Sequence, residues 1–202
     1  MSSRLSDITG AILAGGKSSR MGSDKALLEL NGKAFIQHVA EILHQRFDQV
    51  MVISDYDGCY EFLQIPIYHD VIKNCGPLGG IHSALHHSQT EKVFVAACDM
   101  PFLSVDVVDY LLESDCEMDV TVFQVNEVIQ PLCGLYDKKC LPVLDEQLIL
   151  RDFSVISFLE HCSTTIVTPE VHRVPNISDI LTNINTRAEY DKYVNKSTGP
   201  IS

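Results

Sequence analysis

The residues best suited to chemistry lie together near the N-terminus, where an apolar run at residues 8–13 leads directly into the segment 13–25. That segment contains two adjacent glycines and three cations: Gly15, Gly16, Lys17, Arg20 and Lys25. A strand that ends at paired glycines brings backbone N–H groups close to a ligand, which suits phosphate, and the cations supply the charge that a polyphosphate needs. We therefore predict that this loop binds a nucleoside triphosphate and that the rest of the chain presents a second substrate.

A phosphate-binding P-loop is the nearest alternative, because Gly16-Lys17-Ser18 has the form of the end of the G-x-x-x-x-G-K-[ST] pattern. That pattern also requires glycine at position 11, where the chain has Ala11. For the glycines alone, a strand-to-helix turn with solvated cations is the simpler interpretation. The clustering of charge favours a phosphate site, since four of the chain's 15 lysines and arginines lie within its first 25 positions.

Asp99 follows residues 93–98, which have the composition of a fully buried strand. Ligands of open α/β sheets bind at the carboxyl ends of strands, and Mg²⁺ usually takes one or two carboxylates together with substrate phosphates. We predict that Asp99 is a metal ligand rather than a helix cap, because Ser104 is better placed to cap the next helix. Asp70 ends the preceding apolar segment in the same manner, and there a local turn and a ligand contact are equally good interpretations.

Other polar side chains give weaker signals. Asn183 and Asn185 face the same way if their segment is extended, so their amides suit phosphate or metal-bound water, with ordinary loop residues as the alternative. His82 and His86 have helical metal-ligand spacing, but a serine follows His82 where an H-E-x-x-H site has glutamate, so we expect ordinary histidines. Cys133 has no evident partner base, and no nucleophile is predicted.

The absence of an evident base suits nucleotidyl transfer. An attacking phosphate is already anionic, so the main needs are neutralisation of charge and alignment at the α-phosphorus. Lys17, Arg20 and Lys25 around the departing pyrophosphate, with Mg²⁺ on Asp99, meet both needs.

The composition is that of a globular protein, with 202 residues, 46% hydrophobic residues and a mean hydropathy of +0.08. A net charge of -12 argues against a general nucleic-acid binder. Seven cysteines without a C-x-x-C pair indicate neither a disulfide framework nor a zinc ribbon. Free thiols, and the lack of a signal sequence or membrane-length apolar run, predict a cytoplasmic protein without a membrane partner.

Strand and helix patterns alternate along the first half of the chain. Strands are expected at residues 8–13, 50–53, 65–69 and 93–98, and helices at 34–46, 79–87 and 104–113, with a short extended piece and turn at 27–32. This alternation predicts an α/β fold, doubly wound, with a mostly parallel sheet and helices on both faces.

The second half of the chain has a looser pattern. It predicts an antiparallel extension from strands 120–125 and 129–136, helices at 139–148 and 154–161, and a strand at 165–167. Thr186 and Glu189 form a capping-box pattern that predicts a last helix at 187–194. We expect a single domain over residues 1–195 and a disordered tail at 196–202.

The segment 13–25 resembles the N-terminal signature of the molybdenum cofactor guanylyltransferases, nucleotidyltransferases with a nucleotide-diphospho-sugar-transferase-like fold. Four further segments resemble motifs of that family in the same order, at residues 75–80, 98–102, 130–132 and 183–186. The resemblance implies transfer of GMP from Mg-GTP to molybdenum-molybdopterin, giving molybdopterin guanine dinucleotide and pyrophosphate. It also implies contacts with other proteins of cofactor assembly.

Carried over by position, the resemblance assigns roles to individual residues. GTP contacts are implied for Leu13, Ala14, Gly15, Lys25 and Asp70, and Asp99 would hold Mg²⁺. Gly79, Asn183 and Asn185 would lie nearer the pterin phosphate. Ser54 stands where a family asparagine is expected near the nucleotide, and serine has a donor and an acceptor but less reach.

Other functions remain open from the sequence. The first alternative is another base or acceptor, such as cytidylyl transfer to molybdopterin or transfer to a sugar phosphate, because base choice depends on a few hydrogen bonds that the sequence does not locate. The second is an adaptor that binds a nucleotide or cofactor without catalysis. An adaptor has no need of a metal-placing Asp99, which distinguishes the two classes.

Overall fold

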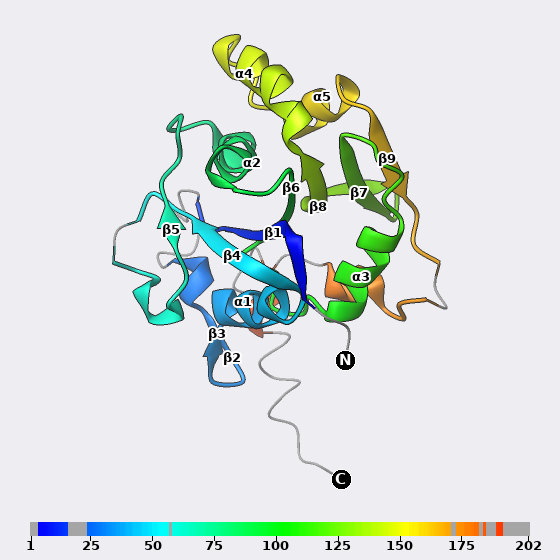
Figure 1. The fold of residues 1–202 in the computed structure, drawn as a ribbon. Helices are drawn as coiled ribbons and strands as arrows, with labels where there is room; N and C mark the ends of the chain where they lie inside the picture. Colours follow the sequence, from blue (N-terminus) through cyan, green and yellow to red (C-terminus); the bar gives the residue numbers. More distant parts are fainter. Residues whose placement is uncertain are drawn as a thin grey trace.

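The computed structural model describes residues 4–15, 24–56, 58–170, 173–181, 184 and 189–191, arranged as a central sheet between helices (Figure 1). The sheet has seven strands in the order β5-β4-β1-β6-β8-β7-β9. Their bounds are β1 Leu5–Leu13, β4 Phe47–Ile53, β5 Ile67–Tyr68, β6 Lys92–Ala97, β7 Val120–Val125, β8 Val128–Asp137 and β9 Thr164–Val167. β1 pairs in parallel with β4 and β6, so the mostly parallel sheet expected from the sequence is confirmed.

The helices cover both faces of the sheet. They are α1 Phe35–Arg46, α2 Gly76–His87, α3 Val105–Glu113, α4 Leu141–Ile149, α5 Val155–Glu160 and α6 Ile177–Ile180. Short 3₁₀ helices form at η1 Lys25–Leu27, η2 Glu61–Leu63 and η3 Lys138–Cys140, and a small hairpin joins β2 Glu29–Leu30 to β3 Lys33–Ala34. These elements give the doubly wound architecture its two helical layers.

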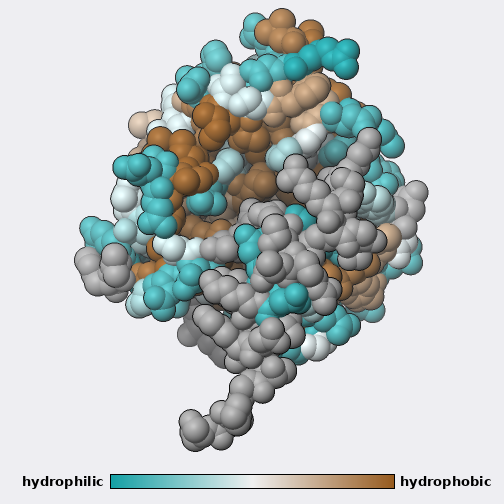
Figure 2. Space-filling model, turned by 180° about the vertical axis from the view of Figure 1, so that it is seen from behind, coloured by the Kyte–Doolittle hydropathy of each residue, from teal (hydrophilic) through white to brown (hydrophobic). Residues whose placement is uncertain are grey.

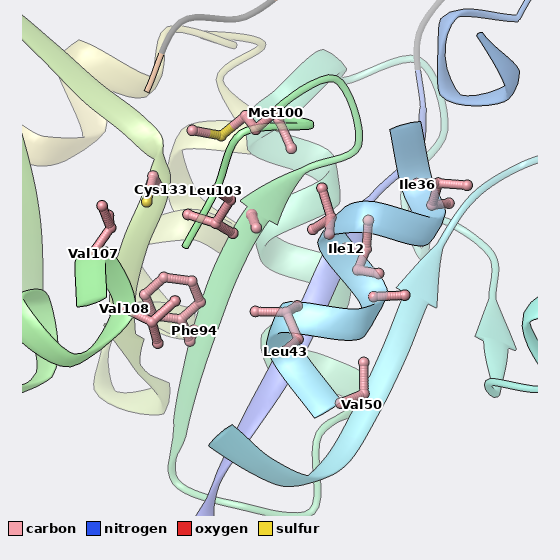
Figure 3. Close-up of a cluster of buried hydrophobic side chains, with 14 of the residues drawn as sticks. Ile12, Ile36, Leu43, Val50, Phe94, Met100, Leu103, Val107, Val108 and Cys133 are labelled. Carbon is pink, nitrogen blue, oxygen red and sulfur yellow. The ribbon is translucent and has the colours of Figure 1, made fainter. Parts of the chain in front are cut away.

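Side chains along the central strands alternate between the two faces of the sheet, so the hydrophobic core has two parts. Ile12 and Phe94 pack with Leu43 of α1 and residues of α3 on one face, as Figure 3 shows. Ala11 and Val95 belong to the cluster under α2, α4 and α5 on the other face. Successive strand residues point to opposite faces, so strands covered on both sides are apolar throughout.

The predicted antiparallel extension is confirmed. β8 runs antiparallel to both β6 and β7, while β9 pairs in parallel with β7. Asn126 and Glu127 connect β7 to β8 with φ values of 49° and 64°, the left-handed conformation that a two-residue hairpin turn of type I′ requires.

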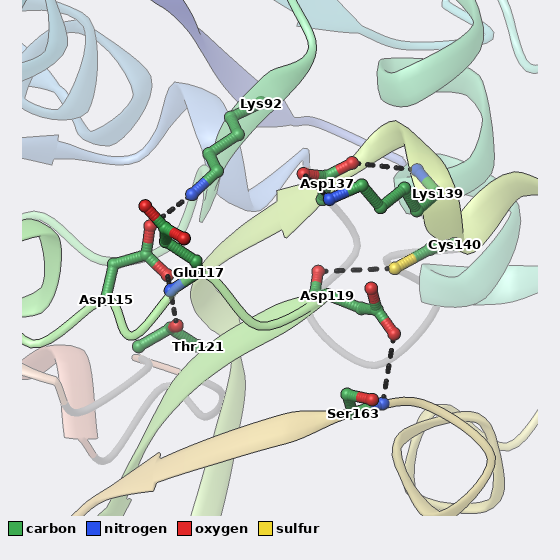
Figure 4. Close-up of polar contacts among 9 residues, drawn as sticks. All are labelled: Lys92, Asp115, Glu117, Asp119, Thr121, Asp137, Lys139, Cys140 and Ser163. Carbon is green, nitrogen blue, oxygen red and sulfur yellow. Dashed lines mark hydrogen bonds and ion pairs between the residues drawn. The ribbon is translucent and has the colours of Figure 1, made fainter.

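Polar contacts secure the start of β7 (Figure 4). Asp115, which forms an ion pair with Lys92 of β6, accepts a hydrogen bond from Thr121 Oγ1 at 3.2 Å. The backbone oxygen of Asp119 accepts the Cys140 thiol at 3.3 Å, and its carboxylate accepts the Ser163 amide at 3.2 Å. All seven cysteines are free thiols, as the sequence predicted.

Several elements differ from the sequence-based expectation. α2 begins three residues earlier than the predicted 79, with Pro77 in its first turn, where the missing amide hydrogen costs no helical hydrogen bond. The strand predicted at 65–69 is reduced to two residues, and η2 and α6 were not predicted. Residues 189–191 are helical, while the rest of the predicted last helix, Thr186 and the tail 196–202 lie outside the described residues.

Apolar side chains are exposed where α4 ends. Ile149 and Leu150 are 78% and 72% exposed, and Figure 2 shows apolar surface at the top of the molecule, where Figure 1 places α4. Among the described residues, no helix has the length and apolar character needed to cross a membrane.

Candidate active site

The parallel strands β1, β4 and β6 end side by side at one edge of the sheet, which we call the carboxyl edge. Leu13 pairs with Ile53 on one side and with Ala97 on the other. The Ala14 amide donates to the Ile53 carbonyl at 2.9 Å, and the Cys98 amide donates to the Leu13 carbonyl at 3.1 Å. The residues that follow these three strands are therefore brought together, as expected for the ligand-binding edge of an open α/β sheet.

Lys25 and Asp99 face each other at this edge. The distance between Lys25 Nζ and Asp99 Oδ2 is 4.0 Å, and the two side chains are 20% and 15% exposed. Lys25 is the first residue of η1, whereas Asp99 follows β6. Two of the three predicted catalytic residues thus come together from distant parts of the chain, and the third, Arg20, lies outside the described residues.

Burial raises the pKa of the Asp99 carboxyl group, while Lys25 and a backbone hydrogen bond oppose that shift. The backbone oxygen of Asp99 accepts the amide of Ile184 at 3.2 Å. Ile184 is fully buried in a small cluster with Leu30 and Phe35. Ile184 therefore lies beside Asp99, whereas Asn183, Asn185, Gly16 and Lys17 lie outside the described residues.

Asp24 and Tyr60 belong to the same group of side chains, and sequence reasoning missed both. Asp24 Oδ1 accepts the amide of Ala26 at 3.0 Å, which caps η1, and Asp24 Oδ2 accepts the hydroxyl of Tyr60. Tyr60 is fully buried, and burial followed by the hydrogen bond to Asp24 raises its pKa, so the hydroxyl stays protonated. The only signal available in the sequence was an acidic residue directly before Lys25.

Ser54 and Asp70 lie at the same edge, after β4 and β5. Ser54 is only 1% exposed, and its hydroxyl accepts the Tyr56 amide at 3.1 Å. The Asp70 amide donates to Asp55 Oδ1 at 3.2 Å. Burial, and then the neighbouring Asp55 charge, raise the pKa of the Asp70 carboxyl group, while Ser83 and Lys73 lower it.

The first turns of α2 pack closely against this edge. A Cβ atom on Gly79 would lie 2.8 Å from the Cβ of Cys75, and one on Gly80 would lie 3.2 Å from a methyl group of Leu13. Gly15 differs, because a Cβ there would meet nothing within 4 Å. Gly79 is therefore required for packing, whereas Gly15 is exposed at the end of β1 with space beside it.

Among the described residues at this edge, His69 is the histidine in contact with a predicted site residue, because its Nδ1 lies 2.9 Å from the Ser54 carbonyl oxygen. His82 is 3% exposed and its Nε2 lies 2.9 Å from Asp145 Oδ1, a contact between α2 and α4 that fits the expected structural histidine. Burial raises the pKa of Cys133 to about 12 and that of Cys98 well above its usual value, so both remain neutral thiols. Within the described residues, no three His, Cys, Asp or Glu side chains converge as a metal site.

Of the two carboxylates next to Lys25, that of Asp99 could hold a metal ion. Both oxygens of Asp24 accept hydrogen bonds from other residues, whereas Asp99 Oδ2 faces Lys25 Nζ at 4.0 Å, an ion-pair distance longer than a hydrogen bond. A single carboxylate fits Mg²⁺, which completes its octahedron with water and substrate phosphate oxygens.

Comparison with known proteins places the chain in a family. The family model of the MobA-like NTP transferase domain matches residues 10–165. A protein of Carboxydothermus hydrogenoformans, named a probable molybdenum cofactor guanylyltransferase, is 39% identical over 93% of this chain and 95% of its own. A relative of Clostridium perfringens with the same name is 37% identical over 92% and 96%.

Solved structures share the fold. A protein of Aquifex aeolicus superimposes with a TM-score of 0.78 and 32% identity, covering 91% of this chain and 96% of that one. Molybdopterin-guanine dinucleotide biosynthesis protein A from Archaeoglobus fulgidus gives a TM-score of 0.80 at 24% identity, covering 94% and 98%. With its matching domain, its similar relatives and its Lys25 and Asp99 at the carboxyl edge, this chain belongs to the MobA-like NTP transferase family.

Proposed function

We propose that this protein transfers the GMP unit of Mg-GTP to molybdenum-molybdopterin, giving molybdopterin guanine dinucleotide and pyrophosphate. The observation that carries the proposal is the pairing of Lys25 with Asp99 at the carboxyl edge, because it puts a cation and a metal-binding carboxylate at one point. The guanylyltransferase names of relatives that match nearly the whole chain support the same base and acceptor.

In this reaction a phosphate oxygen of the acceptor attacks the α-phosphorus of GTP. The bond from the α-phosphorus to the bridging oxygen breaks, and pyrophosphate leaves with the electron pair. The attacking oxygen carries no proton that must be removed, so the reaction requires alignment and neutralisation of charge rather than a general base. The neutral thiols of Cys98 and Cys133 agree with a site that has no protein nucleophile.

Different residues at the carboxyl edge carry out the alignment and the neutralisation of charge. Lys25 neutralises charge on the phosphates, and Gly15 allows them to approach the end of β1. Asp99 holds Mg²⁺, which supplies further neutralisation of the phosphate oxygens when bound. Leu13, Ala14, Ser54 and Asp70 complete the proposed GTP site, together with Gly16, Lys17 and Arg20 from the preceding loop.

The acceptor is proposed to bind on the side of Gly79, Asn183 and Asn185. The hydrogen bond from Ile184 to Asp99 supports this assignment, because it holds the chain between the two asparagines next to the metal-binding residue. Seven free thiols support a reducing compartment, and we propose that the reaction takes place in the cytoplasm. Delivery of the product further implies contacts with other cofactor-assembly proteins.

The decisive experiment measures pyrophosphate release from Mg-GTP with and without molybdopterin, loaded and unloaded with molybdenum. Release that requires both substrates is the expected result. CTP and ATP in parallel reactions test the base, and preferential turnover of CTP would replace the guanylyl assignment with cytidylyl transfer. Binding of GTP without any release would favour an adaptor or a different acceptor.

A further inference from the structure

The carboxylate of Asp24 is held at both oxygens by groups from different parts of the chain. Oδ1 accepts the Ala26 amide within the same turn, at 3.0 Å. Oδ2 accepts the hydroxyl of Tyr60, which lies 36 positions further along, in the connection between β4 and β5. A carboxylate fixed at both oxygens cannot rotate without breaking one of these bonds, so its side chain has a single orientation.

The fixed Asp24 side chain determines the direction in which the Lys25 side chain leaves the turn. The turn that starts at Asp24 is closed by hydrogen bonds from the Leu27 amide to the Asp24 carbonyl and from the Leu28 amide to the Lys25 carbonyl, both 3.1 Å. A lysine side chain has four rotatable bonds, so the direction in which its Cα–Cβ bond leaves the turn decides which groups the ammonium reaches. That ammonium lies 4.0 Å from Asp99 Oδ2.

Tyr60 is well suited to hold the turn. Its side chain is fully buried, so packing holds the ring and its hydroxyl group in one position. Burial raises its pKa, and the hydroxyl remains a donor throughout the neutral range. A hydrogen bond from a hydroxyl to a carboxylate is stronger than one between neutral groups, which suits a contact that must resist movement.

We propose that Tyr60 is a positioning residue for nucleotidyl transfer, whose hydroxyl fixes the Asp24 carboxylate and thereby holds Lys25 opposite Asp99. Tyr60 is fully buried, so its proposed role is exerted through Asp24 rather than by contact with a substrate. The inference rests on the proposed function for its catalytic consequence, but the geometry of Lys25 is open to a separate test.

The kinetic test compares Tyr60→Phe with Tyr136→Phe. Both substitutions remove one buried tyrosine hydroxyl, since Tyr136 is fully buried and donates to the Pro131 carbonyl, but Tyr136 belongs to the core cluster on the face of α2 and α4. We expect kcat to fall about tenfold in Tyr60→Phe, because small displacements of a positioned group are costly in rate. Tyr136→Phe should retain the wild-type kcat, and equal losses in both variants would overturn the proposal.

The route through Lys25 is tested by combining substitutions. If Tyr60 acts only by placing Lys25, then Tyr60→Phe should lower kcat in the wild-type protein but leave that of Lys25→Ala unchanged. A further tenfold loss in the double variant would show that Tyr60 acts in another way. Thermal unfolding of the variants separates these effects from a general loss of structure.

A measurement without substrate keeps this proposal separate from the proposed function. Acetylation of lysines by acetic anhydride, followed by peptide mass analysis, gives the rate at Lys25 relative to Lys139, whose side chain is 70% exposed. Tyr60→Phe should raise the relative rate at Lys25 several-fold, because the ammonium leaves its half-buried place beside Asp99. An unchanged rate would overturn the positioning role, whereas a changed rate in a protein that does not release pyrophosphate from GTP would leave that role standing and refute the proposed reaction.

Discussion

Asp24 and Asp99 both lie beside Lys25, but their oxygens are bound differently. Asp24 gives both oxygens to protein donors, one of them the cap of η1. Asp99 is largely buried, and burial raises the pKa of its carboxyl group although Lys25 and a backbone hydrogen bond oppose the shift. A buried anion gains more from a bound cation, so we propose Asp99 as the carboxylate for the metal and Asp24 as the one that holds the turn.

The substitution Asp99→Asn tests this assignment of roles, because it replaces one carboxylate oxygen with an amide nitrogen. The amide is almost the same size as the carboxylate but lacks the charge that holds Mg²⁺, so we expect pyrophosphate release to fall about a thousandfold. Asp48→Asn is the matched control, since Asp48 lies exposed at the other end of β4 and pairs with Arg4. Activity of Asp99→Asn within a factor of two of the control would remove Asp99 from the metal site.

Asp70 gives a prediction about pH. Burial and the charge of Asp55 raise the pKa of its carboxyl group above the usual 3.8, so the folded protein holds that proton more tightly than the unfolded chain does. Stability is then lost as the pH rises from the unfolded pKa through the folded one. Asp70→Asn should therefore melt at a higher temperature than the wild type at pH 7, with the difference shrinking near pH 3. A lower melting temperature at pH 7 would mean that Asp70 is stabilised as the anion.

At the scale of elements, α2 connects the packing of the protein to its candidate site. Gly76 turns the chain with a positive φ, Pro77 occupies the first turn, and Gly79 lies against Cys75. Ser83, one turn further, donates to the Gly79 carbonyl at 2.7 Å and accepts the Val71 amide at 2.9 Å, next to Asp70. The start of this helix therefore determines where the loop that contains Asp70 lies.

Gly79→Ala should disturb this arrangement. The added Cβ would lie 2.8 Å from the Cβ of Cys75 and 3.3 Å from the Ile72 carbonyl, and a backbone neighbour cannot move aside alone. We expect a loss of about 1–3 kcal/mol in the free energy of unfolding, measured with urea. Gly80→Ala is the control and should cost less, because its contact at 3.2 Å is the mobile end of Leu13. Unchanged stability with weaker acceptor binding would instead give Gly79 a direct ligand role.

The periodicity of the sequence was sufficient to predict most helices and strands, but not the residues at which they begin and the short turns between them. Apolar runs identified the central strands, and Ser104 was correctly expected to cap α3, where it accepts the Val107 amide. The first turn of α2 contains Gly76 and Pro77, which carry no apolar periodicity, so the pattern of apolar residues does not show where the helix begins. η2 has three residues, too few to show helical periodicity.

At the scale of the whole molecule, the sheet brings distant positions together. Lys25, Asp70 and Asp99 could be proposed from the sequence because Lys25 follows a glycine-rich segment and each aspartate follows an apolar run that predicts a strand. Tyr60 was not found, because its hydroxyl meets Asp24 only after the chain has passed through α1 and β4. Contacts of this kind depend on the registration of β1 against β4, which a single sequence does not specify.

The charged groups at the carboxyl edge come together only in the folded protein, which predicts that substrate binding raises its stability. GTP and Mg²⁺ need groups that come together only in the native state, so they should stabilise it by linkage. At a concentration 100 times the dissociation constant, this amounts to about 2.7 kcal/mol. For a chain of this length we expect the melting temperature to rise by roughly 5 to 10 °C.

The metal should account for part of that rise. Asp99 is the proposed metal ligand, so the rise in melting temperature of Asp99→Asn with Mg-GTP should be as small as that of the wild type with GTP and a chelator. Asp48→Asn with Mg-GTP should show the full wild-type rise. Thermal melts with each combination of nucleotide, metal and variant measure this directly. If the wild-type shift is the same with and without Mg²⁺, then nucleotide binding does not require the metal, and the role of Asp99 must lie in the chemical step alone.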